Sequence, residues 1–246
     1  MGLMSSAVEV EARPGPIVVD PGATAIIVVD MQNDFAAPGG MFDRAGIPID
    51  AIQAIVEPIR VVLDAGRAAG MRAVFLKMQF AADLSDAGPP DVPNRIKHRP
   101  LGVGEPMQAP TGESGRILVE GTWNTEIVAA LTPEADDLVV TKHRYSGFYE
   151  TDLDRELRAA GVDTLIFVGA TTSVCVESSV RDAFYRDYRC VLLSDCTAEP
   201  IGSQLARSNH EASLLVIEAL FGWVADSASL VTALSAGRAI ATSARG

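Results

Sequence analysis

The sequence of 246 residues is poor in cysteine, histidine and aromatic residues, and each shortage excludes a class of protein. Its three cysteines, Cys175, Cys190 and Cys196, are odd in number and lie late in the chain, which argues against a disulfide framework and favours a reducing compartment. No two of them have CxxC spacing, so a structural zinc site is not expected. Aromatic residues make up 6% of a chain that is 48% hydrophobic, which predicts an aliphatic core, as in sheets buried on both faces.

The chain also lacks long apolar runs and an excess of positive charge. No run approaches the ~18 apolar residues that span a bilayer, and residues 1–16 have no apolar segment of the kind found in secretory signals. We therefore expect a cytoplasmic protein without a membrane partner. The net charge of −12 would repel phosphate backbones, which argues against nucleic-acid binding. The expected organisation is a flexible N-terminal arm (1–16), one domain (17–236) and a loose C-terminal tail (237–246).

Continuous apolar runs alternate with helical patterns along the domain. The predicted strands are 24–30, 72–78, 137–141, 164–169, 189–193 and a short sixth at 222–224, and the predicted helices are 52–69, 151–161, 174–186, 204–221 and 228–236. The helix over 151–161 is expected to open on a capping box, the TDLD of Thr151–Asp154. The alternation predicts an α/β fold with a parallel sheet between two layers of helices. A polar stretch rich in proline and glycine, about residues 80–121, is expected to be a functional or partly disordered loop.

Three groups of side chains follow the ends of predicted strands. Asp30 ends the first strand, Lys142 follows the third, and the segment 171–175 follows the fourth. Ligands of parallel sheets bind at the carboxyl ends of the strands. These residues are therefore expected to meet at one edge of the sheet.

Cys175 is the candidate nucleophile. In the first turn of a helix, its sulfur would face unpaired backbone amides and the positive end of the helix dipole, which favour the thiolate. The same amides could hold the oxyanion of a tetrahedral intermediate. The alternative is a small buried hydrophobic residue, and the residues alone leave both interpretations open. Cys190, inside a strand, and Cys196, just after it, are expected to lie in the core.

A cysteine nucleophile needs a proton acceptor. His98 lies in the long loop, His143 is the neighbour of Lys142, and His210 is predicted mid-helix and far from any strand end, so none is favoured. Asp30 is the stronger candidate, because a carboxylate that closes a buried apolar run is costly unless it is paired or used. Lys142 would pair with it and stabilise both anions. The alternatives are a loop-capping Asp30 and a solvated Lys142.

Three segments of the chain resemble the isochorismatase-like cysteine hydrolases: IIVVDMQNDF around Asp30, VVTKHRYSGF around Lys142 and VGATTSVCVESSVRDA around Cys175. The resemblance covers about residues 21–234. It implies a three-layer, Rossmann-like α/β sandwich in which Cys175 attacks an amide carbonyl, Asp30 moves the proton and Lys142 balances the charge. It also implies a cis peptide between Ala170 and Thr171 that directs the Thr171 amide, with that of Cys175, at the oxyanion.

The resemblance further restricts the chemistry. Relatives with a metal site carry an aspartate and two histidines after the second strand, whereas this chain reads KMQFAADLSDAG there, so no metal and no cofactor are expected. Cys175 favours an amide substrate over a vinyl ether. The stretches DMQNDFAAPGGMFDRAG, GTWNTEIV, KHRYSGFYETDLD and CVESSVRDAFYRDY look like the branch that hydrolyses ureidoacrylate in pyrimidine breakdown, through a thioester-type intermediate. Met78, Gln79 and Phe80 depart from that branch, which leaves biuret, triuret and N-carbamoylsarcosine hydrolysis as alternatives.

Loop residues near the same edge are candidate substrate contacts, with loop packing as the alternative for each. The predicted contacts with a small amide or ureido substrate are Asn33, Phe35, Gln79, Asn94, Trp123 and Tyr145. A substrate carboxylate would pair with Arg95, Lys97 or Arg99. The resemblance also predicts a homo-oligomer, a dimer or a tetramer. Two other classes stay open: a non-catalytic scaffold that binds a metabolite or partner, and a redox protein in which Cys196 resolves Cys175.

Overall fold

All six strands of the central sheet run parallel. The structure, a computed structural model, describes residues 7–243, with side chains described as far as residue 237. The sheet has the order β10-β9-β8-β3-β4-β7. Its strands are β3 (Thr24–Val29), β4 (Arg72–Met78), β7 (Leu138–Lys142), β8 (Thr164–Ala170), β9 (Arg189–Ala198) and β10 (Trp223–Ala225). The predicted parallel sheet is confirmed.

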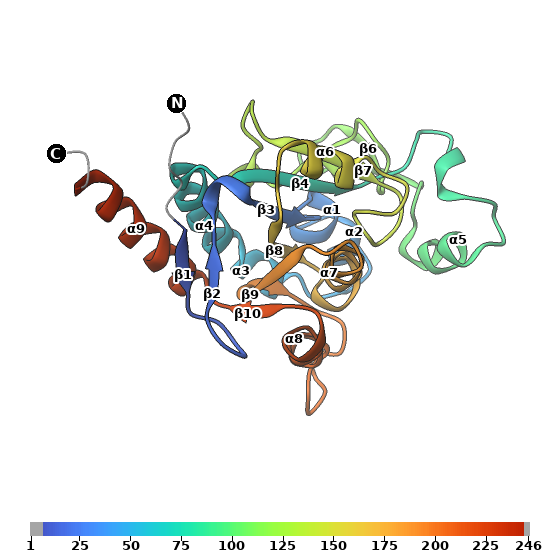
Figure 1. Cartoon of the computed structure of the whole chain (residues 1–246). Helices are drawn as coiled ribbons and strands as arrows, with labels where there is room; N and C mark the ends of the chain where they lie inside the picture. The colour runs from blue at the N-terminus through green and yellow to red at the C-terminus, as the bar shows by residue number, and fades with distance from the viewer. Residues whose placement is uncertain (1–6, 244–246) are drawn as a thin grey trace.

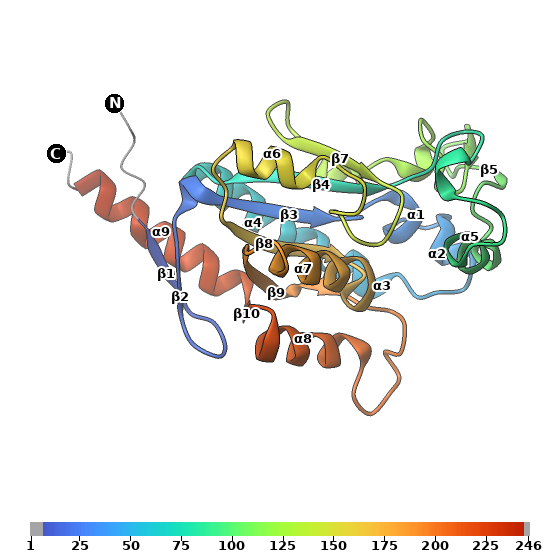
Figure 2. The same cartoon turned by 45° about the vertical axis from the view of Figure 1, so that its right-hand side comes forward.

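Helices cover both faces of this sheet (Figures 1 and 2). One face carries α3 (Asp50–Ala54), α4 (Val56–Ala69) and α9 (Ser227–Ser243), and the other carries α6 (Leu153–Ala159), α7 (Glu177–Phe184) and α8 (Asn209–Leu220). β3 is buried at every residue, and its alternate side chains divide between the two cores: Ile26 and Val28 face α4, while Ile27 and Val29 face α6 and α7. The predicted three-layer sandwich is therefore present.

Several helix boundaries differ from the sequence prediction. The predicted helix over 52–69 is divided at Ile55 into α3 and α4, and ends as predicted at Gly70, which has a left-handed φ of 93°. The capping box predicted at Thr151–Asp154 is absent, because α6 has Asp152 at its N-cap without a side-chain cap bond. A capping box instead opens α8, where Ser208 and Glu211 bond each other's backbone amides, so this helix begins later than residue 204.

The two ends of the described chain are ordered parts of the domain. β1 (Val8–Val10) pairs antiparallel with β2 (Ile17–Val19) beside α9, and Arg13 exchanges backbone bonds of 2.9 and 3.0 Å with Val224 at the edge of the sheet. Residues 7–16, predicted to belong to a flexible arm, are thus paired with the domain, and Val8 and Val10 are buried. α9 runs to Ser243, so residues 237–243 are helical where a loose tail was expected. Residues 1–6 and 244–246 lie outside the described part.

The long stretch over 80–121 is ordered and attached to the carboxyl edge of the sheet. It contains α5 (Pro93–His98) and the hairpin of β5 (Pro106–Gln108) with β6 (Ser114–Arg116). Asp34, in the short helix α1 (Asn33–Ala36), accepts bonds from the Leu118 amide at 2.7 Å and from Asn124 Nδ2 at 2.6 Å. It also accepts one from the amide of Met41, the first residue of α2 (Met41–Arg44). Asp34 therefore joins the stretch to the corner formed by α1 and α2.

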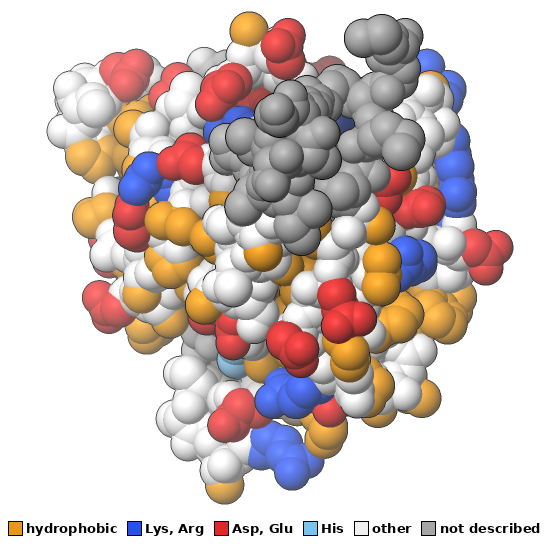
Figure 3. Space-filling model, turned by 60° about the vertical axis from the view of Figure 1, so that its left-hand side comes forward, with side chains coloured by type: hydrophobic (Ala, Val, Ile, Leu, Met, Phe, Trp, Pro, Cys, Tyr) orange, Lys and Arg blue, Asp and Glu red, His pale blue; other side chains and the backbone are white. Residues whose placement is uncertain are grey.

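The charges on the surface are mixed where they can be seen. On the face shown in Figure 3, acidic side chains stand among basic and hydrophobic ones. The negative net charge is therefore not gathered into a single patch on this face. Within residues 7–243, the structure has no helix that is long and apolar enough to cross a membrane.

Candidate active site

Asp30, Lys142 and Cys175 meet at the carboxyl edge of the sheet, as predicted. Asp30 is the residue after β3, with a left-handed φ of 49°, and Lys142 is the last residue of β7. Cys175 lies in a π-helical turn, Thr172–Val176, between β8 and α7. The adjacent positions of β3, β4, β7 and β8 in the sheet explain why residues far apart in the sequence converge here.

Asp30 and Lys142 form a buried ion pair. Lys142 Nζ lies 2.7 Å from Asp30 Oδ2, and the two side chains are 0% and 1% exposed. Asp30 Oδ1 accepts a further bond from the Met78 amide at 3.1 Å. Burial raises the pKa of Asp30, although Lys142 opposes the rise. Burial alone would lower the pKa of Lys142, but the charges of Asp30 and Cys175 outweigh it and raise this pKa. The two shifts favour a protonated Lys142 and make the Asp30 carboxyl easier to protonate than an exposed one.

The Cys175 thiol lines the same cavity as Asp30 and lies close enough to Asp30 and Lys142 for both to influence its pKa. Burial raises the pKa of Cys175, and the Asp30 charge adds to the effect while Lys142 opposes it. This rise runs against the thiolate that the sequence analysis favoured, because loss of water disfavours the charged form of the sulfur. As an attacking group this thiol would have to lose its proton, and Asp30 is a carboxylate that lines the same cavity.

The backbone around these residues is closely packed. The Ala170–Thr171 peptide bond is cis, as the resemblance implied. Gly169, just before it, has a φ of 111°, and a Cβ at this position would lie 2.2 Å from the Val29 carbonyl oxygen. Only glycine lets β8 come this close to β3. The close approach places the turn that carries Cys175 beside Asp30.

A polar network lies behind the nucleophile turn. Glu199 Oε2 accepts bonds from the Ser173 amide at 2.9 Å and from Ser173 Oγ at 2.5 Å, and its Oε1 accepts one from the Ile201 amide at 3.0 Å. His210 Nδ1 lies 2.9 Å from Thr172 Oγ1. The expectation that His210 is far from any strand end is wrong, since it lies in the first turn of α8 and faces this turn. The sequence analysis missed Glu199, although it directly follows β9 at the same edge of the sheet.

Glu199 is expected to hold the nucleophile turn in place. In Glu199→Gln, one of the two oxygens becomes a donor, so either Ser173 or Ile201 loses its acceptor. We expect the free energy of unfolding to fall by about 1–3 kcal/mol, the usual effect of a buried donor left unpaired, and kcat to fall more than KM rises. Urea unfolding and steady-state kinetics measure both. Glu218→Gln is the control: this half-buried carboxylate of α8 pairs with Arg13 at 2.9 Å and does not line the cavity. Equal effects in the two variants would contradict the role of Glu199.

A cavity of about 240 Å³ opens above Cys175. Asp30, Cys175, Ala170 and Thr171 form its floor. Its walls are mainly apolar, and Lys97, His98 and Tyr145 are the polar side chains among them. The apolar wall residues are Phe35, Met41, Phe42, Ile47, Met78, Pro100, Leu101, Val174 and Ile201. A cavity of this size is below the ~300–1,000 Å³ typical of drug-sized ligands, so a small substrate fits it best.

Of the six predicted substrate contacts, Phe35 and Tyr145 line this cavity. Asn33, Gln79, Asn94 and Trp123 are not among its lining residues in the described part of the chain. These residues bond neighbouring segments of the chain instead. Asn33 Nδ2 donates to the Trp123 carbonyl at 2.8 Å. Gln79 Nε2 donates to Thr141 Oγ1 at 3.2 Å, and Asn94 Nδ2 donates to the Ala87 carbonyl at 3.1 Å. The structure thus does not bring these four side chains to the lining of this cavity, and their contact with a substrate stays a prediction.

The remaining histidines and cysteines have other partners. His143 Nδ1 bonds the Gln79 carbonyl at 2.7 Å, and His98 Nδ1 bonds that of Asn94 at 2.7 Å. All three cysteines are free and buried, and Cys196 packs in the core on the opposite face of the sheet from Cys175. A disulfide between Cys175 and Cys196 is therefore not supported. The residues the structure describes contain no group of three or more His, Cys, Asp or Glu that could hold a metal ion.

Comparisons with known proteins agree with this geometry. The model of the isochorismatase domain matches residues 24–229. The chain is 43% identical over 233 residues to a ureidoacrylate amidohydrolase, RutB, of Methylorubrum extorquens, covering 95% of this chain and 91% of that protein. It is 41% identical over 221 residues to RutB of Rhizobium rhizogenes, covering 90% and 87%.

Solved structures show the same relationship. A cysteine hydrolase from Pseudomonas syringae pv. phaseolicola 1448A superposes with a TM-score of 0.74 and 31% identity, covering 96% of this chain and 100% of that one. The N-carbamoylsarcosine amidase of Thermoplasma acidophilum gives a TM-score of 0.61 and 28% identity, covering 83% and 96%. With a match over most of its length and the same fold, the chain belongs to the isochorismatase family.

Proposed function

We propose that this protein is a cysteine amidohydrolase that cleaves a C–N bond of a small ureido or carbamoyl compound, with ureidoacrylate as the first candidate substrate. One observation carries the proposal: Cys175 and Asp30 line the same small cavity, and Asp30 forms a buried ion pair with Lys142. The high identity to ureidoacrylate amidohydrolases over nearly the whole chain supports the choice of substrate.

In the first half of the reaction, Cys175 would form a bond to the substrate carbonyl carbon. Its thiol proton passes to the Asp30 carboxylate as the sulfur attacks, and Lys142 stabilises the negative charge that the three groups share. The C–N bond then breaks, and Asp30 returns the proton to the leaving nitrogen. The products of this half are a free amine or ammonia and an S-acyl form of Cys175.

In the second half, water would release the acyl group. Asp30 takes a proton from the water as its oxygen attacks the thioester-type carbon. The C–S bond breaks, and the proton goes from Asp30 to the Cys175 sulfur, which restores the resting thiol. In both halves the amides of Thr171 and Cys175 are proposed to hold the carbonyl oxygen as it gains negative charge.

The competing substrates are biuret, triuret and N-carbamoylsarcosine, and the similarity to an N-carbamoylsarcosine amidase supports keeping the last of these. Ammonia release from each compound and from ureidoacrylate, with a metal chelator present throughout, distinguishes them. We expect chelator-resistant release that is fastest with ureidoacrylate. Faster release from another of these compounds would transfer the proposal to that substrate. No release from any would favour a non-catalytic scaffold, which the complete set of Asp30, Lys142 and Cys175 opposes.

The surroundings of the enzyme are also proposed from the chain. Three free, buried cysteines are typical of a reducing compartment, so we propose the cytoplasm. A dimer or tetramer is proposed as the functional form. Large hydrophobic side chains are exposed at the ends of α7 and α8: Phe184, Tyr185 just after α7, and Leu220. They support an oligomer because apolar groups gathered on a surface often mark an interface. Light scattering that gives the mass of one chain would contradict it.

A further inference from the structure

Few side chains could hold a negatively charged substrate in this cavity. Asp30 is an anion, and the cation nearest to it, Lys142, is already paired with it. Burial lowers the pKa of His98, which is therefore neutral near pH 7. Tyr145 has a raised pKa and is also neutral. Among the described residues that line the cavity, Lys97 is left as the source of uncompensated positive charge.

Lys97 stands where the cavity meets the solvent. It lies on α5 and also lines an outer groove of about 490 Å³, which shares Lys97 and Tyr145 with the cavity. Lys97 is exposed and has no ion pair within the part of the chain that the structure describes. Arg144 also lines the groove, with its guanidinium 5.8 Å from the centre of the Tyr149 ring. The approach to the cavity is thus positively charged in a chain whose net charge is −12.

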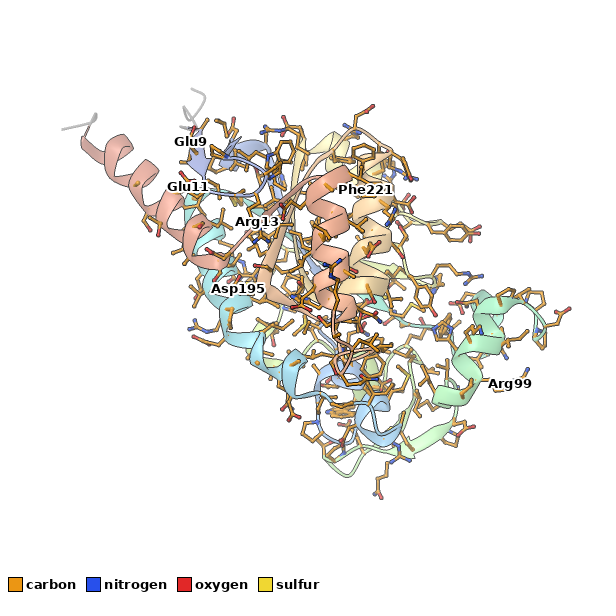
Figure 4. All side chains as sticks on the ribbon, turned by 90° about the horizontal axis from the view of Figure 1, so that it is seen from below. Glu9, Glu11, Arg13, Arg99, Asp195 and Phe221 are labelled. Atoms are coloured by element: carbon orange, nitrogen blue, oxygen red, sulfur yellow. The ribbon has the colours of Figure 1, made fainter. Side chains whose placement is uncertain are left out.

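The neighbouring arginines of the same segment point elsewhere. Arg95 Nη1 donates to the Leu84 carbonyl at 3.2 Å, and Arg99 Nη2 donates to the Pro90 carbonyl at 3.2 Å. Neither lines the cavity above Cys175. Figure 4 shows Arg99 at the outer edge of the lobe that contains α5. Of the three basic residues that the sequence offered for a carboxylate, the structure brings Lys97 to the cavity.

The shape of the cavity then restricts the substrate. With the scissile carbonyl at Cys175, the middle of a short substrate lies between apolar walls that include Phe35, Met41 and Leu101. A carboxylate at the far end would be costly in such surroundings without a cation. We propose that Lys97 binds this carboxylate, and that the enzyme therefore selects ureido acids over neutral ureido compounds. This inference rests on the proposed function and deepens it, because it separates ureidoacrylate from the uncharged biuret and triuret.

The test compares ureidoacrylate with its methyl ester, which keeps the ureido group but has no charge. In Lys97→Met we expect kcat/KM for the acid to fall about tenfold, mostly through a higher KM, as for the loss of one charge-assisted hydrogen bond. For the ester, kcat/KM of Lys97→Met should stay within about twofold of the wild-type value, because the ester has no charge for Lys97 to bind. Lys97→Arg should keep most of the preference for the acid, and Arg99→Met, on the same segment, should change neither substrate.

Three outcomes would overturn the inference while leaving the amidohydrolase in place: a wild type that prefers the ester, a Lys97→Met variant with an unchanged ratio of acid to ester, or one that loses both substrates equally. Binding of ureidoacrylate to Cys175→Ala protein, measured by calorimetry, gives a second readout that needs no turnover. It should weaken about tenfold when Lys97→Met is added. A wild type that neither hydrolyses nor binds any ureido compound would remove the proposed function, and the inference with it.

Discussion

Replacing Cys175 with alanine is expected to reduce turnover at least about a thousandfold while the protein remains folded. Loss of the nucleophile removes the covalent route entirely, and comparable losses in other covalent hydrolases are of this order or larger. The alanine takes the place of a small buried side chain on a turn whose backbone contacts are unchanged, so the effect on stability is expected to be about 1 kcal/mol. Ammonia release measures the first effect, and near-ultraviolet circular dichroism with urea unfolding measures the second.

Cys190 and Cys196 provide matched controls for this substitution. Both are free and buried like Cys175, and burial raises the pKa of Cys190 to about 12. Neither lines the cavity, so Cys190→Ala and Cys196→Ala should keep turnover within about threefold of wild type, because core changes distant from a site act mainly on stability. Retained turnover in Cys175→Ala, or an equal loss in either control, would contradict the assignment of the nucleophile.

Replacing Lys142 with methionine is expected to weaken both stability and catalysis. Methionine has a similar length but leaves the Asp30 carboxylate buried and unpaired, since the two side chains are 0% and 1% exposed. Breaking a buried pair by removing one partner usually costs about 3–5 kcal/mol of unfolding free energy. Asp30 would then bind a proton at neutral pH and stop serving as the base, which should lower kcat at least about a hundredfold. Urea unfolding at several pH values and steady-state kinetics test both parts.

The double variant Asp30→Asn with Lys142→Met separates the two effects. With no buried charge left alone, it should regain part of the stability lost in Lys142→Met, whereas turnover should stay at the level of the single variant or below. Arg67→Met, which breaks a partly exposed ion pair with Asp137 away from the cavity, is a control for losing any cation. If Lys142→Met unfolded no more easily than this control, the account of the buried pair would be wrong.

The meeting of Asp30, Lys142 and Cys175 at one edge of the sheet was predictable, because each of them follows the end of a strand. A buried β-branched run ending in Asp30, and strands ending at Lys142 and before Thr171, place side chains on one edge of any parallel sheet. The order of the strands across the sheet, β8-β3-β4-β7, then brings these particular ends together. The cis peptide at Ala170–Thr171 came from the family resemblance, since the local residues carry no signal for it.

The walls of the cavity were not predictable in the same way. They come from α1, α2 and α5, short elements whose places depend on long-range bonds such as those of Asp34 to Leu118 and Asn124. Residue type suggested polar contacts for Asn33, Gln79 and Asn94, yet each of these amides binds the backbone or side chain of a neighbouring loop. His210 was placed far from any strand end and Glu199 was missed, because their bonds to Thr172 and Ser173 join segments that are distant in the sequence.

The protonation of Cys175 also depends on the folded environment. A cysteine near a helix start suggested a thiolate, but the structure buries the sulfur against the Asp30 carboxylate. The pKa of this thiol depends on how far the sulfur is removed from water and on which charged side chains of other strands lie near it, and local sequence reveals neither. This matters for the proposed mechanism, in which the neutral thiol passes its proton to Asp30 as the sulfur attacks.

The covalent bond to Cys175 is the central claim, and rapid acid quenching followed by peptide mass spectrometry tests it most directly. Wild-type protein quenched during turnover of ureidoacrylate should carry the mass of the substrate acyl group on the peptide that contains Cys175, and on neither the Cys190 nor the Cys196 peptide. The Cys175→Ala protein should show no adduct and no turnover. Turnover that leaves the acyl group on a different side chain, or that continues without Cys175, would contradict the account.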